Sequence, residues 1–433
     1  MANTYLTRTQ VAGNRQIFTQ SIWFKLTNTA DQVFISSYND ANNYNCFFLE
    51  SGNQVLQVLW KKSGSNAALL NTTRKFRDTS AWYHVVLAVD TTQGTAANRI
   101  KLYVNGVQET SFSTATYPNQ NESIEVNDNN TNQRIGALNT DTFFQGVASY
   151  VAQIDGTQEL PTVFGETDAT TGEWKIKTSI TPSVAWGNNG FLVLKDGNSL
   201  TDASPNSNNF TVAGGTLTKT EDCPSNVFAT MNPLALYHSS GGTLSNGNNS
   251  YVWSNYQINT RSTLGMPKGK FYWEQKCLGD EGSNRIGMCT SAFTNYIDTD
   301  STDAHYNSTG NGGIYLMMSA ASTSWQRTNN DTSKNVDTYT NATALATNNI
   351  IMNAVDVDAG KYWIGINGTW FYSGDPAAGS NPQITFTNSG GDDLHVFLGS
   401  GTNNSRSFSF NFGNGYFGTT AVSSAGTNAS GNG

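Results

Sequence analysis

The chain is poor in charged residues. Asp, Glu, Lys and Arg together make up 13% of its 433 residues, about half of the usual share. The formal net charge is −8, whereas a nucleic-acid-binding protein normally carries a basic face. The densest basic clusters are Lys61-Lys62 and residues 74–77, which we interpret as solvated strand ends. The sequence therefore predicts no nucleic-acid partner.

Cysteines and long apolar segments are also scarce. Cys46, Cys223, Cys277 and Cys289 lie far apart, which argues against a zinc site or a disulfide scaffold. We expect them to be small buried apolar residues of a protein made in a reducing cytoplasm. No apolar run approaches the roughly 20 residues that span a bilayer, and the first ten residues do not resemble a signal peptide. No membrane insertion is expected.

Asn, Thr, Ser and Gly take the place of the missing charged residues, and these residue types favour turns and strand edges over helices. Aromatic residues make up 12% of the chain, with 10 Trp, 18 Tyr and 22 Phe, and they supply large apolar areas for packing. A chain of this length normally divides into two domains of about 200 residues. The composition predicts short strands, joined by many turns, around two cores.

The hydrophobic pattern repeats every two residues, as in half-buried strands. Residues 83–90 and 100–104 both alternate in this way, and Asn105-Gly106 follows them. Asn-Gly between alternating segments is a strong hairpin signal, because both turn residues must take positive φ. The same arrangement returns at Asn367-Gly368. Further strands are expected at residues 21–26, 47–49, 55–60, 191–194, 270–276 and 408–412.

Many short antiparallel strands without a helix of normal length indicate sandwiches or jelly rolls. We predict an all-β chain of two antiparallel β-sandwich (jelly-roll) domains in tandem. The first domain is expected at residues 1–222 and the second at residues 223–418. Residues 419–433 contain Ser, Ala, Gly and Asn without a core-forming residue, so we expect a flexible tail there.

The first half resembles a laminin-G-like, concanavalin A-like jelly roll. Its closest motif is Trp82-Tyr83-His84, followed by two strands and an Asn-Gly turn. The order of motifs over the whole first half resembles a group of tailed-phage virion proteins that is common in viruses of marine bacteria. The other segments of that order are residues 5–8, 13–15, 18–25, 164–166, 186–192 and 202–210.

The second half resembles a SPRY domain. The most specific stretch is residues 356–370, and the other matching segments are residues 268–274, 285–288, 373–376 and 410–413. Together the two resemblances imply a fold and a virion context. They do not imply a reaction, since both folds support many functions.

No catalytic set is recognisable in the sequence. Glucanases of the concanavalin-like fold carry Glu-x-Asp-x-x-Glu on one strand, because glycoside hydrolysis needs two carboxyl groups. The nearest approach here is Asp298, Asp300 and Asp303 in a polar loop of the second half. These residues are also the one candidate calcium site, although the favoured interpretation is a turn capped by Asp side chains. We therefore predict no enzyme, no cofactor and no metal beyond this weak calcium candidate.

Histidine and aromatic residues complete the candidate list. The four His are scattered, and His84 is interpreted as a packing residue of the laminin-G-like motif. Neither a Gly-x-Ser-x-Gly elbow nor a phosphate-binding loop is present. Sugar binding uses exposed aromatic rings together with polar side chains, so Tyr296 and Trp325 are the candidate ligand contacts.

These observations favour a phage virion structural protein: a tail fibre, a tail-associated protein or a capsid-decorating component. Its loops would bind host-surface glycans or neighbouring subunits. The expected partners are other virion proteins and further copies of the chain, and the expected location is the virion, assembled in the host cytoplasm. Two alternatives remain open: a virion-associated polysaccharide-degrading enzyme, and a purely architectural virion protein.

Overall fold

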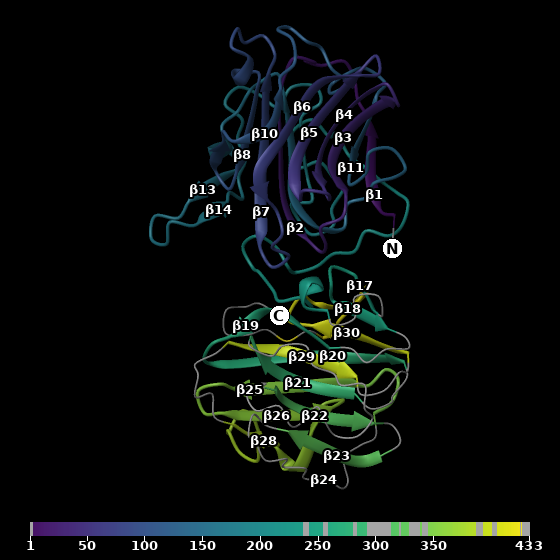
Figure 1. The fold of residues 1–433 in the computed structure, drawn as a ribbon, viewed down its shortest axis with the longest axis vertical. Coiled ribbons are helices and arrows are strands. Elements are labelled where there is room, and N and C mark those ends of the chain that lie inside the picture. The colour runs from purple at the N-terminus through teal and green to yellow at the C-terminus, as the bar shows by residue number, and fades with distance from the viewer. Residues whose placement is uncertain are drawn as a thin grey trace. The chain divides into compact units, whose positions relative to one another are not determined.

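The computed structural model describes residues 3–236, 242–253, 259–279, 284–291, 313–319, 322–328, 338–339, 345–386, 393–400, 405–424 and 426. The chain divides into two compact units, Met1–Val227 and Phe228–Gly433. β-strands and short 3-10 helices make up the secondary structure of the described residues (Figure 1). The predicted all-β fold class is therefore confirmed. Among the same residues, no helix is long and apolar enough to cross a membrane.

The larger sheet of the first unit has eight strands in the order β10-β6-β5-β4-β3-β11-β1-β16. All neighbouring pairs in it are antiparallel. Its strands are β1 (Tyr5–Thr9), β3 (Gln32–Asp40), β4 (Asn43–Glu50), β5 (Val55–Lys62), β6 (Ser65–Lys75), β10 (Phe112–Thr116), β11 (Asn132–Ile135) and β16 (Thr211–Ala213).

The second sheet of this unit has six antiparallel strands in the order β15-β12-β2-β7-β8-β9. They are β2 (Ile17–Leu26), β7 (Trp82–Asp90), β8 (Ile100–Val104), β9 (Val107–Glu109), β12 (Gly146–Asp155) and β15 (Phe191–Val193). The 3-10 helices η1 (Ala96–Asn98) and η2 (Pro161–Val163) lie in its connections.

The hairpin between β8 and β9 forms as its sequence predicts. Asn105 and Gly106 have φ values of +47° and +80°, so both turn residues are left-handed, as a two-residue hairpin turn requires. The equivalent turn of the second unit, at Asn367 and Gly368, has φ values of +49° and +85°. In both places the turn joins two neighbouring antiparallel strands, β8 with β9 and β26 with β27.

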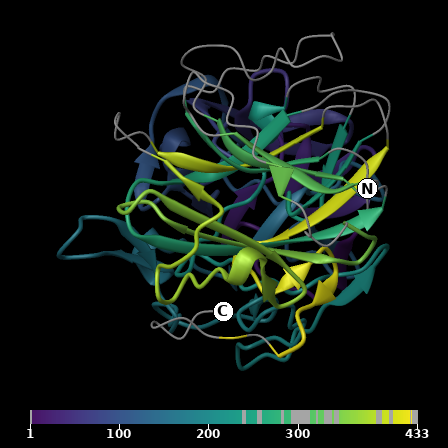
Figure 2. The ribbon, with the colours of Figure 1, turned by 90° about the horizontal axis from the view of Figure 1, so that it is seen from below.

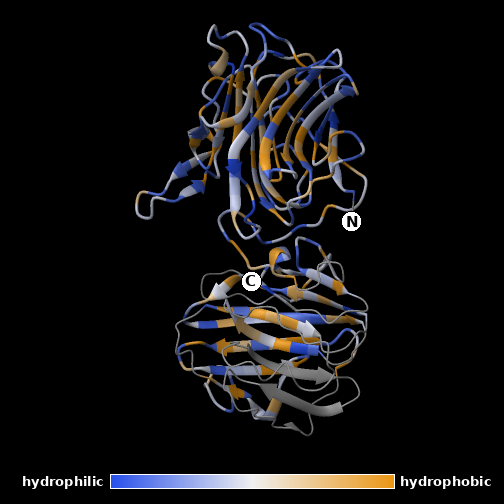
Figure 3. Cartoon of the chain, viewed as in Figure 1, coloured by the Kyte–Doolittle hydropathy of each residue, from blue (hydrophilic) through white to orange (hydrophobic). Residues whose placement is uncertain are grey.

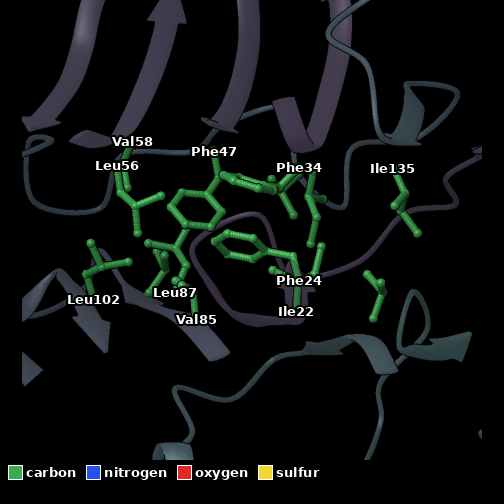
Figure 4. Close-up of a cluster of buried hydrophobic side chains, with 14 of the residues drawn as sticks. Ile22, Phe24, Phe34, Phe47, Leu56, Val58, Val85, Leu87, Leu102 and Ile135 are labelled. Atoms are coloured by element: carbon green, nitrogen blue, oxygen red, sulfur yellow. The ribbon is translucent and has the colours of Figure 1, made fainter. Parts of the chain in front are cut away.

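Alternation along the strands builds the core of the first unit. Val85, Leu87 and Val89 of β7 point between the two sheets, where they join one large apolar cluster. Figure 4 shows the rings of Phe24 and Phe34, from opposite sheets, packed together in that cluster. Their centroids lie 4.3 Å apart. Hydrophobic and hydrophilic positions follow one another along the strands (Figure 3).

The six-stranded sheet is covered on its other face as well. Val86, Ala88 and Ile154 belong to a second apolar cluster there. A small hairpin, β13 (Gly165–Thr167) paired with β14 (Trp174–Ile176), lies in the chain segment that follows β12. Its tip projects from the rest of the unit in two perpendicular views (Figure 1 and Figure 2). Because both faces of the sheet are covered, most residues of its long strands β2 and β7 are buried, including polar ones.

The second unit is also a sandwich. Its first sheet contains β17 (Gly242–Ser245), β18 (Ser250–Trp253), β20 (Lys270–Gly279), β25 (Ile350–Asp356), β26 (Lys361–Ile366), β27 (Thr369–Trp370), β28 (Ile384–Thr385) and β30 (Arg406–Asn411). Its second sheet contains β19 (Asn259–Met266), β21 (Asn284–Thr290), β22 (Gly313–Ser319), β23 (Ser322–Thr328), β24 (Thr338–Tyr339) and β29 (Leu394–Ser400). The 3-10 helices η3 (Pro233–Ala235) and η5 (Phe371–Ser373) complete the unit. Trp273 and Ile351 from the first sheet and Ile286 and Leu398 from the second share one core.

Two details differ from the sequence predictions. The tail expected from residue 419 begins inside a hairpin, where β32 (Thr420–Ala421) pairs with β31 (Tyr416–Phe417). Phe417 of β31 is buried, whereas both residues of β32 are exposed and are joined to β31 by backbone pairing. Cys223 is half-buried, whereas the other three cysteines are buried. It lies in an isolated bridge to Asn226 rather than in a strand of the core.

Candidate functional site

The outer face of the eight-stranded sheet carries half-exposed aromatic side chains. Phe47 and Leu49 of β4 point into the core. Because successive side chains of a strand point to opposite faces, Tyr44 and Cys46 point outward. The same rule shows which side chains of the neighbouring strands point outward, because the core-facing residues of those strands are known. The alternation therefore separates an inner face, which is largely apolar but includes the polar Gln133, from the outer face.

Strand register brings the outward residues into two rows. We name the first the tyrosine row; it consists of Asn132, Tyr38, Tyr44 and Lys61, which are successive cross-strand partners on β11, β3, β4 and β5. We name the second the arginine row; it consists of Arg134, Ser36, Cys46, Leu59 and Leu69 on β11, β3, β4, β5 and β6. The two rows lie side by side across the sheet, one pleat apart.

The two tyrosines of the tyrosine row stack on each other. The ring centroids of Tyr38 and Tyr44 lie 6.0 Å apart, with 24° between the ring planes. Both side chains are half-buried. The Cζ atom of Arg134 lies 5.6 Å from the ring centroid of Tyr38, and the Nζ atom of Lys61 lies 6.0 Å from that of Tyr44. A pair of aromatic rings thus has a cation beside each ring.

The electrostatics of this face favour binding through neutral phenols and cations. Burial raises the pKa of Tyr44, and the neighbouring Cys46, Tyr38 and Asp141 raise it further. The hydroxyl therefore stays protonated at neutral pH and can both donate and accept hydrogen bonds. The residues of the two rows include no carboxylate. One carboxylate, that of Asp141, does lie near enough to Tyr44 to act on its pKa.

A buried serine–histidine pair lies on the six-stranded sheet. Ser21 Oγ and His84 Nε2 are 2.9 Å apart, and Trp174 Nε1 donates to His84 Nδ1 at 2.9 Å. Because an indole nitrogen can only donate, Nδ1 must be the acceptor, and the imidazole proton resides on Nε2. That proton is donated to Ser21. The imidazole therefore cannot accept the serine proton, as a catalytic base would.

His84 is held between two indole rings. Its ring stacks on Trp23, with centroids 4.5 Å apart, and on Trp174, with centroids 5.9 Å apart. Burial lowers the pKa of His84 to about 3. The side chain is fully buried and neutral, and it attaches the β13–β14 hairpin to the sheet through Trp174.

The carboxylate of Asp155 belongs to a polar network between the two sheets. Its Oδ1 accepts hydrogen bonds from Asn14 N at 2.8 Å and Asn127 Nδ2 at 3.0 Å. Its Oδ2 accepts one from Asn189 N at 3.0 Å. Burial lowers the pKa of the nearby Arg8 to about 10, which leaves the guanidinium charged at neutral pH. The hydrogen bonds of Asp155 hold the loops that contain Asn14, Asn127 and Asn189 in place.

None of the candidate binding residues predicted from the sequence belongs to the tyrosine row or the arginine row. Tyr296, Asp298, Asp300 and Asp303 lie outside the described residues. Trp325 lies in β23, where its backbone pairs with Tyr339. Over the part of the chain that is described, no group of three or more His, Cys, Asp or Glu side chains could hold a metal ion.

Sequence reasoning missed the tyrosine row. Tyr38 and Tyr44 stand on either side of a polar hairpin turn, which is a recognisable signal for two cross-strand aromatic residues. Lys61, interpreted as part of a solvated strand end, is half-buried beside Tyr44. Arg134 comes from a strand nearly a hundred residues later, so its place beside Tyr38 depends on the pairing of β11 with β3.

A protein-family model matches part of the first unit. Residues 2–157 match the Laminin_G_3 family, described as the concanavalin A-like lectin/glucanases superfamily. This match confirms the concanavalin A-like resemblance for that stretch. It contains every residue of the tyrosine row and of the arginine row. No curated protein matches the chain.

Several solved structures are similar to parts of the chain. The SPRY domain of human HERC1 has 12% identity and a TM-score of 0.28, covering 42% of this chain and 96% of that one. The PSpry domain of TRIM65 has 13% identity and a TM-score of 0.32, covering 42% and 89%. A heptameric SAP-like pentraxin from Limulus polyphemus has 14% identity and a TM-score of 0.32, covering 49% and 89%.

Proposed function

We propose that this chain is a non-enzymatic glycan-binding protein of a tailed-phage virion. The observation that carries the glycan-binding part is the stacked Tyr38–Tyr44 pair on the outer face of the eight-stranded sheet. Sugar rings have apolar faces that pack against aromatic rings, and their hydroxyls bond to polar groups at the edges. The tyrosine row offers both, with two ring systems and the side chains of Asn132 and Lys61 at its ends.

The fold supports this assignment. The matching superfamily takes its description from lectins and glucanases, and the matched residues include the whole face. A rigid antiparallel sheet holds side chains in a fixed spacing of about 4.8 Å between strands. Binding to a regular glycan chain therefore needs little ordering of the protein, which reduces the entropic cost of association.

The absence of carboxylates from both rows supports a binding role over a catalytic one. The alternative enzyme would release reducing sugar from a glycan that it binds. The purely architectural alternative would bind no glycan at all. A binding assay combined with a reducing-sugar assay separates the three functions.

The test uses the full chain against a panel of bacterial surface and marine polysaccharides. Tyr38→Ala and Tyr44→Ala are each expected to lower affinity for the bound glycan by about tenfold, since an aromatic contact is worth roughly 1.5 kcal/mol. Tyr272→Ala is the matched control: Tyr272 is a tyrosine of the second unit with 51% of its surface exposed, and its loss should leave affinity unchanged. Equal affinity of all four proteins would refute the proposed site.

The virion part of the proposal depends on the sequence resemblance to tailed-phage virion proteins. It includes contacts with other virion proteins, self-association and assembly in the host cytoplasm. Mass spectrometry of purified particles from the source virus tests it directly. The chain is expected in stoichiometric amount in intact particles, and its absence from them would disprove a virion role while leaving glycan binding untouched.

A further inference from the structure

Arg134 is a buried cation with few partners. Its side chain is 8% exposed. Its Nη1 donates one hydrogen bond, 3.5 Å long, to the backbone oxygen of Leu138. Its Nε is buried and has no hydrogen-bond partner. Within the described residues it forms no ion pair closer than 4.0 Å. Charged side chains are rarely buried in this way unless they are paired.

Arg8 provides an internal comparison. It is buried to the same extent, with 8% exposed, and it lies on the neighbouring strand β1, which pairs with β11. Its guanidinium donates four hydrogen bonds between 3.0 and 3.2 Å, to Gln133, Asn208 and two oxygens of Asn189. The fold thus satisfies one buried arginine on the inner face and leaves the other, on the outer face, with unused donors.

Lys61 marks the other end of the same surface. It is half-buried beside Tyr44, and it makes no ion pair with any described residue. The adjacent Lys62 does form one, with Glu122. β11 and β5 are separated by β3 and β4, so the two cations are on the order of 14 Å apart at about 4.8 Å per strand. That span accommodates a short stretch of a glycan chain lying across both tyrosines.

A guanidinium with free donors is suited to an oxyanion. Its planar group matches a carboxylate or a sulfate through two parallel hydrogen bonds. The chain as a whole carries a net charge of −8, so its general field repels anions. Attraction of an anionic ligand must therefore come from local cations, and Arg134 and Lys61 supply them at this face.

We infer that the tyrosine row binds an anionic glycan, with Arg134 contacting a carboxylate or sulfate group of a sugar stacked on Tyr38. This inference depends on the proposed glycan-binding function and adds the class of glycan. Arg134 and Lys61 act as specificity-determining residues, because a neutral glycan would leave their charges unpaired beneath it.

The experiment compares matched polymers. The full chain is titrated with polygalacturonate and with its carboxyl-reduced, neutral form, and separately with dextran sulfate and neutral dextran. The first pair tests for a carboxylate and the second for a sulfate, so the preferred polymer identifies the acidic group. We expect tight binding to one anionic polymer and at least about tenfold weaker binding to its neutral partner.

Arg134→Met and Lys61→Met are expected to weaken binding of the preferred anionic polymer, by about tenfold for Arg134 and less for the more exposed Lys61. Binding of the neutral form should not change. Lys62→Met is the control, because it removes the neighbouring charge that already pairs with Glu122. Arg134→Met should also keep or raise the melting temperature, since it removes a charge whose donors the fold leaves unsatisfied.

Three outcomes would overturn the inference. If the anionic and neutral polymers bind equally well, and neither Arg134→Met nor Lys61→Met changes binding, anion selection is refuted although the protein still binds glycans. If Lys62→Met weakens anion binding as much as Arg134→Met does, the attraction of anions is non-specific. No binding of any glycan, with Tyr38→Ala indistinguishable from wild type, would show that the proposed function itself is wrong.

Discussion

Acid should destabilise the first unit through His84. The imidazole is fully buried, and burial lowers its pKa to about 3 from 6.5. Above pH 6.5 it is neutral in both the folded and the unfolded state, so it contributes nothing to pH dependence. Between pH 6.5 and about 3, only the unfolded chain takes up the proton. The free energy of unfolding must therefore fall as the pH falls through this window.

The size of the effect follows from the pKa difference. Each pH unit inside the window lowers the free energy of unfolding by about 1.4 kcal/mol. Over the whole window the loss amounts to roughly 5 kcal/mol, a large share of the stability of an ordinary domain. Below about pH 3 the folded state is protonated too, and the contribution becomes constant.

The substitution His84→Gln should remove this dependence. Glutamine keeps one donor and one acceptor for Ser21 and Trp174 but does not titrate. Urea unfolding of the full chain, measured at intervals from pH 3.5 to 8, gives the difference between wild type and variant at each pH. The contributions of other titrating groups cancel in that difference. The difference in the free energy of unfolding should change by about 1.4 kcal/mol per pH unit below pH 6.5.

Ser21→Ala is the control for this experiment. It removes the hydroxyl that accepts the imidazole proton but retains the imidazole. It should lower stability by about 1 kcal/mol at every pH and preserve the slope. A wild-type-minus-His84→Gln difference that stays flat between pH 3.5 and 6.5 would contradict the buried, neutral imidazole.

Three further predictions concern stability, each measured by urea unfolding at pH 7. Phe34→Ala should cost about 3–5 kcal/mol, because the ring is fully buried against Phe24; Val184→Ala, at an 81% exposed site, should change stability by less than about 0.5 kcal/mol. Lys25→Met should cost about 3–5 kcal/mol, because it breaks a buried 2.9 Å ion pair with Asp222, whereas a second change, Asp222→Leu, should restore part of that loss. Gly106→Ala should cost about 2 kcal/mol or more, since its φ is +80° and a Cβ would meet the ring of Trp174 at 2.4 Å; an unchanged stability would show that the β13–β14 hairpin moves freely.

The pairing of neighbouring strands was predictable because its causes are local. The Asn105-Gly106 turn needs two residues with positive φ, and both the turn and its flanking strands stand next to each other in the sequence. The inward face of β7 was equally predictable, since alternation with period two places Val85, Leu87 and Val89 on one side. Local backbone preference and burial act together at these positions.

The candidate site was not predictable from the same kind of pattern. Trp325 and Tyr296 were selected for their polar surroundings in the sequence, which says nothing about which residues meet across a sheet. Tyr38 and Tyr44 looked like ordinary strand residues beside a turn. Only the register of β3 with β4 makes them cross-strand partners with stacked rings.

The sequence by itself determined the class of fold, the positions of several strands in each unit and the inward face of β7, because side-chain alternation and turn chemistry act over a few residues. The tertiary structure alone decided that Arg134 lies beside Tyr38, that Arg8 finds four acceptors where Arg134 finds one, and that Trp174 covers His84. The contacts of Arg8, of Arg134 with Tyr38 and of Trp174 with His84 join segments about 90 to 200 residues apart. Their formation depends on how two sheets close around a shared core, which no local pattern encodes.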